Sequence, residues 1–239
     1  MSFVDGDFVE MEYQAWDADA GKLIATTYEE SAKKEGIYND KIKYGKVLVI
    51  VGSGGVIKGL DREIRKMGVG EEKEFTFKPE EAFGERSDDL VRVMPLSEFR
   101  AHDIDPVPGM EINIDNAPAI VKSVNSGRVV VDANNPYAGK NIKYKIKIAS
   151  KLEDAGKKVE ALGDTYSAKP SKVEVKGKNA TLVYDSKVNK NADYFVGKAS
   201  LIAALFTYMK EFEKVDVQEE YIKAEIEDGQ KNEKNETEA

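Results

Sequence analysis

The glycines between Gly52 and Gly70 are the first residues of this chain whose spacing could serve chemistry, because glycine-rich turns cradle phosphates and dinucleotides. Residues 47–70 read VLVIVGSGGVIKGLDREIRKMGVG, an apolar run that leads into a glycine loop and a short helical segment. A dinucleotide fingerprint requires a third glycine at the position of Ile57, and a phosphate loop requires Gly-Lys followed by Ser or Thr, which occurs nowhere in the chain. The loop therefore predicts a tight backbone turn that presents Val56 and Ile57 to a pocket.

Side chains that carry acid, base, nucleophilic or metal chemistry are scarce. The chain has no cysteine and a single histidine, His102, and it lacks a G-x-S-x-G element. Neither a Ser-His-Asp triad nor a zinc site can be assembled from such a set. The acidic pairs Glu71-Glu72 and Glu80-Glu81 are typical of solvated turns. We therefore expect no metal and no cofactor.

Length, charge and hydropathy limit the partners. The 239 residues suggest one or two domains, and 41% of them are hydrophobic, which is enough for buried cores. The net charge of −8 argues against nucleic acid, and no apolar run approaches the roughly 18 residues of a membrane span. The start of the chain has neither the basic nor the apolar region of a signal peptide. With no cysteine, these features favour a cytoplasmic protein that binds neither nucleic acid nor membrane.

The first half of the chain reads as short strands, turns and short helices. Residues 8–13 alternate as FVEMEY and predict a strand, with Phe8 and, after a twist or bulge, Tyr13 available to a core. The other predicted elements before Phe83 are a turn over residues 16–21, a strand over 22–27, a helix over 29–34, a strand from Val47 and a helix over 60–67.

A strictly alternating segment, NIKYKIKIAS at residues 141–150, predicts one more strand of the same unit. The long interval between Phe83 and this strand predicts an inserted unit. Its expected elements are strands over residues 90–94, 110–114, 120–124 and 128–132 and a helical turn over 96–101.

The C-terminal region begins after Lys151 with a polar connector. The elements expected there are a hairpin of residues 173–175 and 180–184, a helix over 193–213 and a strand over 215–222. The helix carries two apolar stripes, Phe195, Ala199, Ile202, Phe206 and Met209 on one, and Leu201, Leu205, Tyr208 and Phe212 on the other. One stripe can cover the small sheet, and either the rest of the chain or a second subunit must cover the other. Residues 225–239 hold six acids and two lysines, half of the net charge, and we predict a disordered tail over residues 227–239.

Three short strings in a fixed order resemble the FKBP-type peptidyl-prolyl isomerases, and most closely their archaeal long form. They are V-I-x-G-L (Val56, Ile57, Gly59, Leu60), V-G-E (Val69, Gly70, Glu71) and A-F-G (Ala82, Phe83, Gly84). The inserted unit resembles the insert-in-flap domain of SlyD-like members, where it is a chaperone module, and NPYAGK at residues 135–140 resembles its closing junction. The resemblance covers most of residues 1–151.

Matched to the family motif, the resemblance implies an apolar pocket for the prolyl ring. Leu60 would form its floor, the backbone N–H of Ile57 would hold a substrate carbonyl, and Phe83 would cover the reacting bond. The implied lining residues are Tyr13, Ile24, Ala25, Val47, Val56, Ile57, Leu60, Phe83 and Tyr144.

Some of these positions depart from the common family pattern. Ile24-Ala25 stands where Phe-Asp is usual, so the one acidic group of the pocket is missing. Phe83 replaces a common Tyr, and Leu60 replaces the Trp of small eukaryotic members. We expect the loss of the acid to reduce catalysis and macrolide binding rather than to abolish catalysis.

The predicted fold class is α+β, in three units. These are an FKBP-like antiparallel half-barrel sheet around a short helix (residues 1–85 and 138–152), a β-rich insert (86–137) and a C-terminal α+β unit (153–226). The insert is either a folded spacer or a peptide-binding surface, and for the second role we expect contacts from Val91, Met94, Ile104 and Met110.

The predicted function is peptidyl-prolyl cis-trans isomerisation coupled to the binding of unfolded, proline-containing polypeptides. The alternative is a non-catalytic chaperone or assembly module whose pocket has decayed, which Ile24-Ala25 would permit. The predicted assembly is a monomer or a homodimer through the C-terminal unit.

Overall fold

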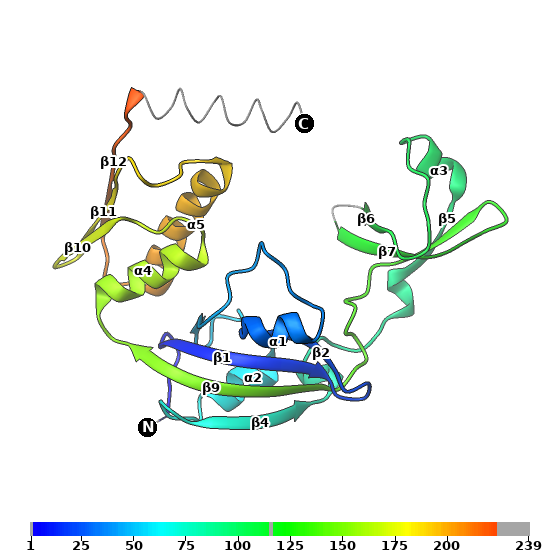
Figure 1. Ribbon diagram of the computed structural model, residues 1–239, viewed down its shortest axis with the longest axis horizontal. Coiled ribbons are helices and arrows are strands. Elements are labelled where there is room, and N and C mark those ends of the chain that lie inside the picture. Colours follow the sequence, from blue (N-terminus) through cyan, green and yellow to red (C-terminus); the bar gives the residue numbers. More distant parts are fainter. Residues whose placement is uncertain (1, 115–116, 224–239) are drawn as a thin grey trace.

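The computed structural model describes residues 2–114 and 117–223, which fold around three separate sheets (Figure 1). The sheets are antiparallel except for one parallel pair in the C-terminal unit, and short helices pack on them. The predicted α+β class is confirmed. The predicted tail, residues 227–239, lies outside the described residues.

The first sheet has the order β2-β1-β9-β4, and β3 also pairs with β1. Its strands are β1 (Phe8–Asp17), β2 (Lys22–Thr26), β3 (Val47–Ile50), β4 (Glu72–Phe77) and β9 (Ile142–Leu152). The long strand β1 pairs with β9 along its whole length on one edge, and with β3 and then β2 on the other. The helices of this unit are α1 (Glu29–Lys34) and α2 (Lys58–Ile64), and the 3-10 turn η1 (Pro79–Glu81) follows β4.

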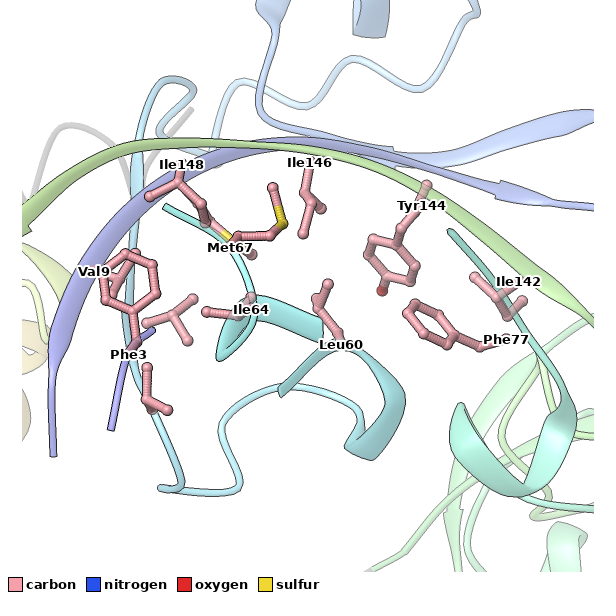
Figure 2. Packing of buried hydrophobic residues seen from close by; sticks show 14 residues of the cluster. Phe3, Val9, Leu60, Ile64, Met67, Phe77, Ile142, Tyr144, Ile146 and Ile148 are labelled. Atoms are coloured by element: carbon pink, nitrogen blue, oxygen red, sulfur yellow. The ribbon is translucent and has the colours of Figure 1, made fainter. Parts of the chain in front are cut away.

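Helix α2 lies in the concave face of this sheet because the odd-numbered residues of β1 from Val9 to Ala15 are apolar or aromatic. Val9 and Met11 belong to the same buried cluster as Leu60 and Ile64 of α2, and Figure 2 shows Val9 on the side of Ile64. Gly59 permits the close contact of α2 with β4, since a Cβ there would lie 2.4 Å from Cδ1 of Phe77. The apolar floor predicted from the sequence is therefore the junction of α2 with the sheet.

Phe8 does not share this core, although the alternation suggested that Phe8 and Tyr13 could face one side after a bulge. Phe8 belongs to the cluster of the C-terminal unit, whereas Tyr13 packs on the α2 side. The register shift in this region lies between Glu10 and Met11 in the pairing with β9. Both faces of the start of β1 are buried. An alternating sequence pattern predicts only one buried face, so it does not predict this arrangement.

The insert is a sheet of order β5-β8-β7-β6 at the end of the half-barrel where β9 begins (Figure 1). Its core is Phe99, Val121, Val129 and Val131. The elements are η2 (Asp88–Leu90), β5 (Val91–Pro95), α3 (Leu96–Arg100), β6 (Glu111–Ile114), β7 (Ala117–Asn125) and β8 (Arg128–Asp132). Each predicted strand of the insert is present within a few residues of its expected bounds.

The neck between the half-barrel and the insert is held by polar contacts between its two chain segments. Ser87 and Asn134 exchange two hydrogen bonds, each of 2.9 Å, and Asp132 accepts from Asn134 and Arg86. Burial raises the pKa of Asp132, but hydrogen bonds from Asn134 and Arg86 outweigh it and lower the pKa to about 2. Because the pKa falls on folding, these bonds stabilise the neck fully above the ordinary carboxyl pKa and are lost as the pH drops toward 2.

The C-terminal unit has the sheet order β10-β11-β12 and two helices. Its elements are α4 (Ala155–Thr165), β10 (Lys172–Lys176), β11 (Asn179–Tyr184), α5 (Ala192–Tyr208) and β12 (Lys214–Glu219), with β12 parallel to β11. Helix α5 ends five residues before the predicted bound at Glu213. This unit sits at the end of β1 and β9 opposite the insert (Figure 1).

Helix α4 contradicts the prediction of a polar connector after Lys151. The Asp154 side chain caps it by accepting from Lys157 N at 2.9 Å, and Val159 and Leu162 are buried. Most of its other residues are polar or small, so no apolar stripe stands out. The cap and the i, i+3 apolar pair were the signals available in the sequence.

Candidate functional site

The predicted pocket floor lies where α2 meets β9 and β4. Leu60 is 2% exposed and Tyr144 is 8% exposed, and Figure 2 shows both side chains and Phe77 converging on one point. The ring centroids of Tyr144 and Phe77 are 6.1 Å apart, with an angle of 56° between the ring planes. The ring of Tyr13 lies 5.8 Å from that of Tyr144. The floor is an aliphatic side chain framed by tilted aromatic rings.

All the other predicted lining residues are half-buried and pack against the core cluster that contains Leu60 and Tyr144. They are Tyr13, Ile24, Ala25, Val47, Val56, Ile57 and Phe83. Residues from β1, β2, β3, the glycine loop and the segment after β4 are thus brought together, although they are far apart in the sequence. These half-buried side chains surround the more deeply buried Leu60 and Tyr144. Their role in catalysis stays a prediction.

Tyr137 packs beside the predicted lining residue Phe83, although the sequence prediction did not include it. Its ring centroid lies 5.5 Å from that of Phe83, and it packs against the same cluster. It belongs to the NPYAGK junction, where the return of the chain from the insert brings it over Phe83. The only signal for Tyr137 in the sequence is the NPYAGK motif, which by itself indicates no more than the end of the insert.

The glycine loop is fastened to α2 by Asp61. Asp61 accepts from Gly52 N at 2.8 Å, and it is held in turn by two hydrogen bonds from Arg65, of 3.0 and 2.7 Å. Gly52 and Gly54 have φ angles of +79° and +77°, which an L side chain rarely adopts. Ile57 then stands at the N-cap of α2, and in the described chain no acceptor bonds to its N–H. The assignment of that N–H to a substrate carbonyl stays a prediction.

Burial determines the protonation of the two tyrosines at the site. Burial raises the pKa of Tyr144 to about 12, with a further rise from the neighbouring Tyr13, and burial also raises the pKa of Tyr13. Both hydroxyls are therefore neutral at physiological pH. The floor and walls offer apolar surface and neutral dipoles to a substrate.

The half-barrel over a short helix, with an apolar aromatic pocket and an inserted sheet, defines the class of prolyl isomerases. A family model described as FKBP-type peptidyl-prolyl cis-trans isomerase matches residues 2–97, and a second, described as FKBP26, IF domain, matches residues 92–137. The chain belongs to the FKBP-type peptidyl-prolyl cis-trans isomerase family, which confirms the resemblance seen in its motifs. Both models end before the C-terminal unit.

Relatives in bacteria and archaea show the same relationship. The short-type peptidyl-prolyl cis-trans isomerase of Methanocaldococcus jannaschii is 37% identical over 143 residues, which are 60% of this chain and 90% of that protein. The FKBP-type isomerase SlyD of Helicobacter pylori is 28% identical over 102 residues, 41% of this chain and 55% of the relative. SlyD of Vibrio cholerae is 31% identical over 103 residues, 41% of this chain and 51% of the relative.

Ala25 offers a direct test of the departure from the family pattern. It pairs with Ala15 and packs against the pocket cluster, so a carboxylate there would face the site. We expect Ala25→Asp to raise kcat/KM on a short prolyl peptide by about threefold, roughly 0.7 kcal/mol. The rate should also become pH-dependent in the weakly acidic range, because burial raises the pKa of a new carboxyl.

Ala25→Asn is the matched control, since it keeps the size and polarity of the new side chain without the charge. It should give neither the gain nor the pH dependence. An unchanged or lower rate for Ala25→Asp would refute the role assigned to the missing acid.

Proposed function

We propose that this chain catalyses Xaa-Pro isomerisation in unfolded or folding proteins in the cytoplasm, with the insert capturing apolar segments for the pocket. The observation that carries the proposal is that every predicted lining residue belongs to, or packs against, the one core cluster that contains Leu60 and Tyr144. Family membership supports the activity. A fractionation of cells by compartment tests the location.

The pocket would act by removing water from the prolyl amide. The bond before proline rotates over a barrier of ~18–20 kcal/mol, and spontaneous exchange takes roughly tens to hundreds of seconds. The twisted amide has lost conjugation and is less polar than the planar ground state, so an apolar site binds the twisted form better. If this lowers the barrier by ~6 kcal/mol, the rate rises on the order of ten-thousandfold.

Each part of the site has a separate task in this scheme. Leu60 supports the prolyl ring, and Tyr13, Val47 and Tyr144 form the walls. The N–H of Ile57 holds a substrate carbonyl and fixes the chain on one side of the rotating bond. Phe83, held by Tyr137, covers that bond from the side of the insert.

The insert supplies a half-buried apolar surface suited to varied peptide segments. Met94, Ile104 and Met110 pack on its small core without being buried, and Val91 is also half-buried on β5. Methionine adapts its shape to different partners, which fits the capture of unrelated chains. The SlyD relatives carry isomerase names, and the chaperone role is our inference for this chain.

The proposal is tested on two substrates, a short prolyl peptide and a protein whose refolding is limited by prolyl isomerisation. The intact chain should accelerate both, and the protein more strongly per molecule of enzyme. Acceleration of neither would favour the alternative, a chaperone module with a decayed pocket.

We also propose that a second copy of the chain covers the exposed stripe of α5. The stripe with Leu201 and Leu205 is buried in the C-terminal unit, whereas Phe195 and Phe206 on the other stripe are each 46% exposed. Exposed aromatic side chains at this spacing on one helix are typical of an interface. Met209, on the same stripe as Phe195 and Phe206, is buried, so the exposed surface is shorter than the sequence predicts.

Sedimentation equilibrium tests this interface. The intact chain should be a dimer at micromolar concentration, and Phe206→Lys should shift it to a monomer, because a lysine in an apolar contact stays unpaired. Val93→Lys, which adds the same charge at an exposed apolar position of the insert, should leave the dimer intact. A monomeric wild type at these concentrations would exclude the proposal.

A further inference from the structure

A cleft of about 200 Å³ lies between the half-barrel and the C-terminal unit. One wall is β3 with the glycine loop, including Ser53, Gly55 and Val56. The opposite wall comes from the C-terminal unit, with Leu162 of α4, Tyr166 just after it and Tyr208 at the end of α5. The residues of the two walls are more than a hundred positions apart in the sequence. The cleft therefore forms only when the two units pack together in the folded chain.

The cleft and the proposed isomerase site share one residue, Val56. This residue packs on the pocket cluster and also lines the cleft. The next residue, Ile57, has the N–H assigned to a substrate carbonyl. An extended chain advances ~3.3–3.6 Å per residue, so a substrate that is bound at Ile57 and runs toward Val56 can place a residue near the cleft within a few positions of the proline.

The size and chemistry of the cleft fit a single side chain. Its volume is below the roughly 300–1,000 Å³ of sites for small molecules, but it can accept one aromatic or long aliphatic group. Tyr166 and Tyr208 are half-buried there, and neither hydroxyl has a hydrogen-bond partner among the described residues. Tyrosines in this state offer apolar ring surface with a polar edge, a combination common at peptide-binding sites.

The C-terminal unit is fixed over the loop rather than loosely attached. Phe8 and Ile50 of the half-barrel belong to the same buried cluster as Val159 and Leu162 of α4. Outside this core, Lys43 Nζ lies 2.7 Å from Asp164 Oδ1. A preorganised wall costs less ordering entropy when a substrate binds than a mobile one would.

We propose that Tyr166 and Tyr208 form a specificity subsite for a large apolar side chain of the substrate, one to three residues from the proline. The inference rests on the proposed placement of the prolyl ring at Leu60. It assigns the C-terminal unit a positioning role in isomerisation. The insert and the C-terminal unit then contact one substrate from the two ends of the half-barrel (Figure 1).

The test uses short Ala-based prolyl peptides in which a single Phe is moved through the three positions on either side of the proline. With the full-length wild type, Phe at one position should raise kcat/KM about tenfold over the all-Ala peptide, mainly through KM. The Tyr166→Ala/Tyr208→Ala variant should lose this preference, so that its kcat/KM for the Phe peptide equals its kcat/KM for the all-Ala peptide. Tyr221→Ala, an exposed tyrosine of the same unit outside the cleft, should retain the preference.

A second variant protects the test against a packing defect in the double mutant. Thr165 lines the cleft and is exposed, so Thr165→Trp should fill the space without emptying the core and should abolish the same preference. A wild type that isomerises all peptides equally, or a preference that survives both variants, would overturn the subsite. A wild type inactive on every peptide would instead contradict the proposed isomerase site itself.

Discussion

Replacing Leu60 by lysine should lower kcat/KM for a short prolyl peptide by at least about a hundredfold, roughly 2.7 kcal/mol in the barrier. Leu60 is 2% exposed and faces Tyr144 and Phe77, so the ammonium group would enter the space assigned to the prolyl ring. A charge there brings water with it and favours the planar, polar amide over the twisted one. The measurement is the cis-to-trans rate of the peptide with and without protein.

A loss of activity must be separated from a loss of the fold. Ile64 lies one turn further along α2 and is also buried. Figure 2 shows it on the side of Val9, away from Tyr144 and Phe77. The pair Leu60→Ala and Ile64→Ala should cost similar stability, about 2–5 kcal/mol each, while only Leu60→Ala should impair isomerisation. If Leu60→Lys remains folded and fully active, the site is not at this floor.

The residues of the candidate site could be singled out because the family motifs are local strings, and their catalytic roles stay a prediction. The string from Val56 to Leu60 marks the glycine loop and the helix that follows it, although α2 begins at Lys58 and ends at Ile64, ahead of the predicted range of residues 60–67. The strands of the insert could be predicted for a related reason, because each shows its own pattern of apolar residues over a few positions. Features that depend on a short segment of chain can therefore be predicted from the residues of that segment.

Features that depend on contacts between distant segments were missed. Phe8 packs with α4, which lies more than a hundred residues later, and the polar sequence of α4 is itself typical of a connector. Tyr137 meets Phe83 only because the neck returns the chain to its starting point. The cleft beside Val56 has the same origin, and no periodicity in the sequence of either wall predicts it.

Deleting the insert should separate the two activities proposed for the chain. The hydrogen bonds between Ser87 and Asn134 bring the ends of the neck together, so residues 88–133 can be replaced by a short glycine linker. This retains Tyr137, the partner of Phe83. We expect kcat/KM on a short peptide to stay within about threefold, and catalysis of proline-limited refolding to fall about a hundredfold. The second effect follows from the lost effective concentration of bound substrate.

Two neighbouring residues of β5 provide a finer version of this experiment without deleting any structure. Met94 is half-buried on the insert cluster, whereas Val93 beside it is 62% exposed on the other face of the strand. Met94→Lys should weaken catalysis of refolding and leave the short peptide unaffected, and Val93→Lys should change neither. Equal refolding rates for the deletion, Met94→Lys and the wild type would mean that the insert is a spacer. A parallel fall on the short peptide would instead mean that it shapes the pocket, because Phe83 and Tyr137 stand at its base.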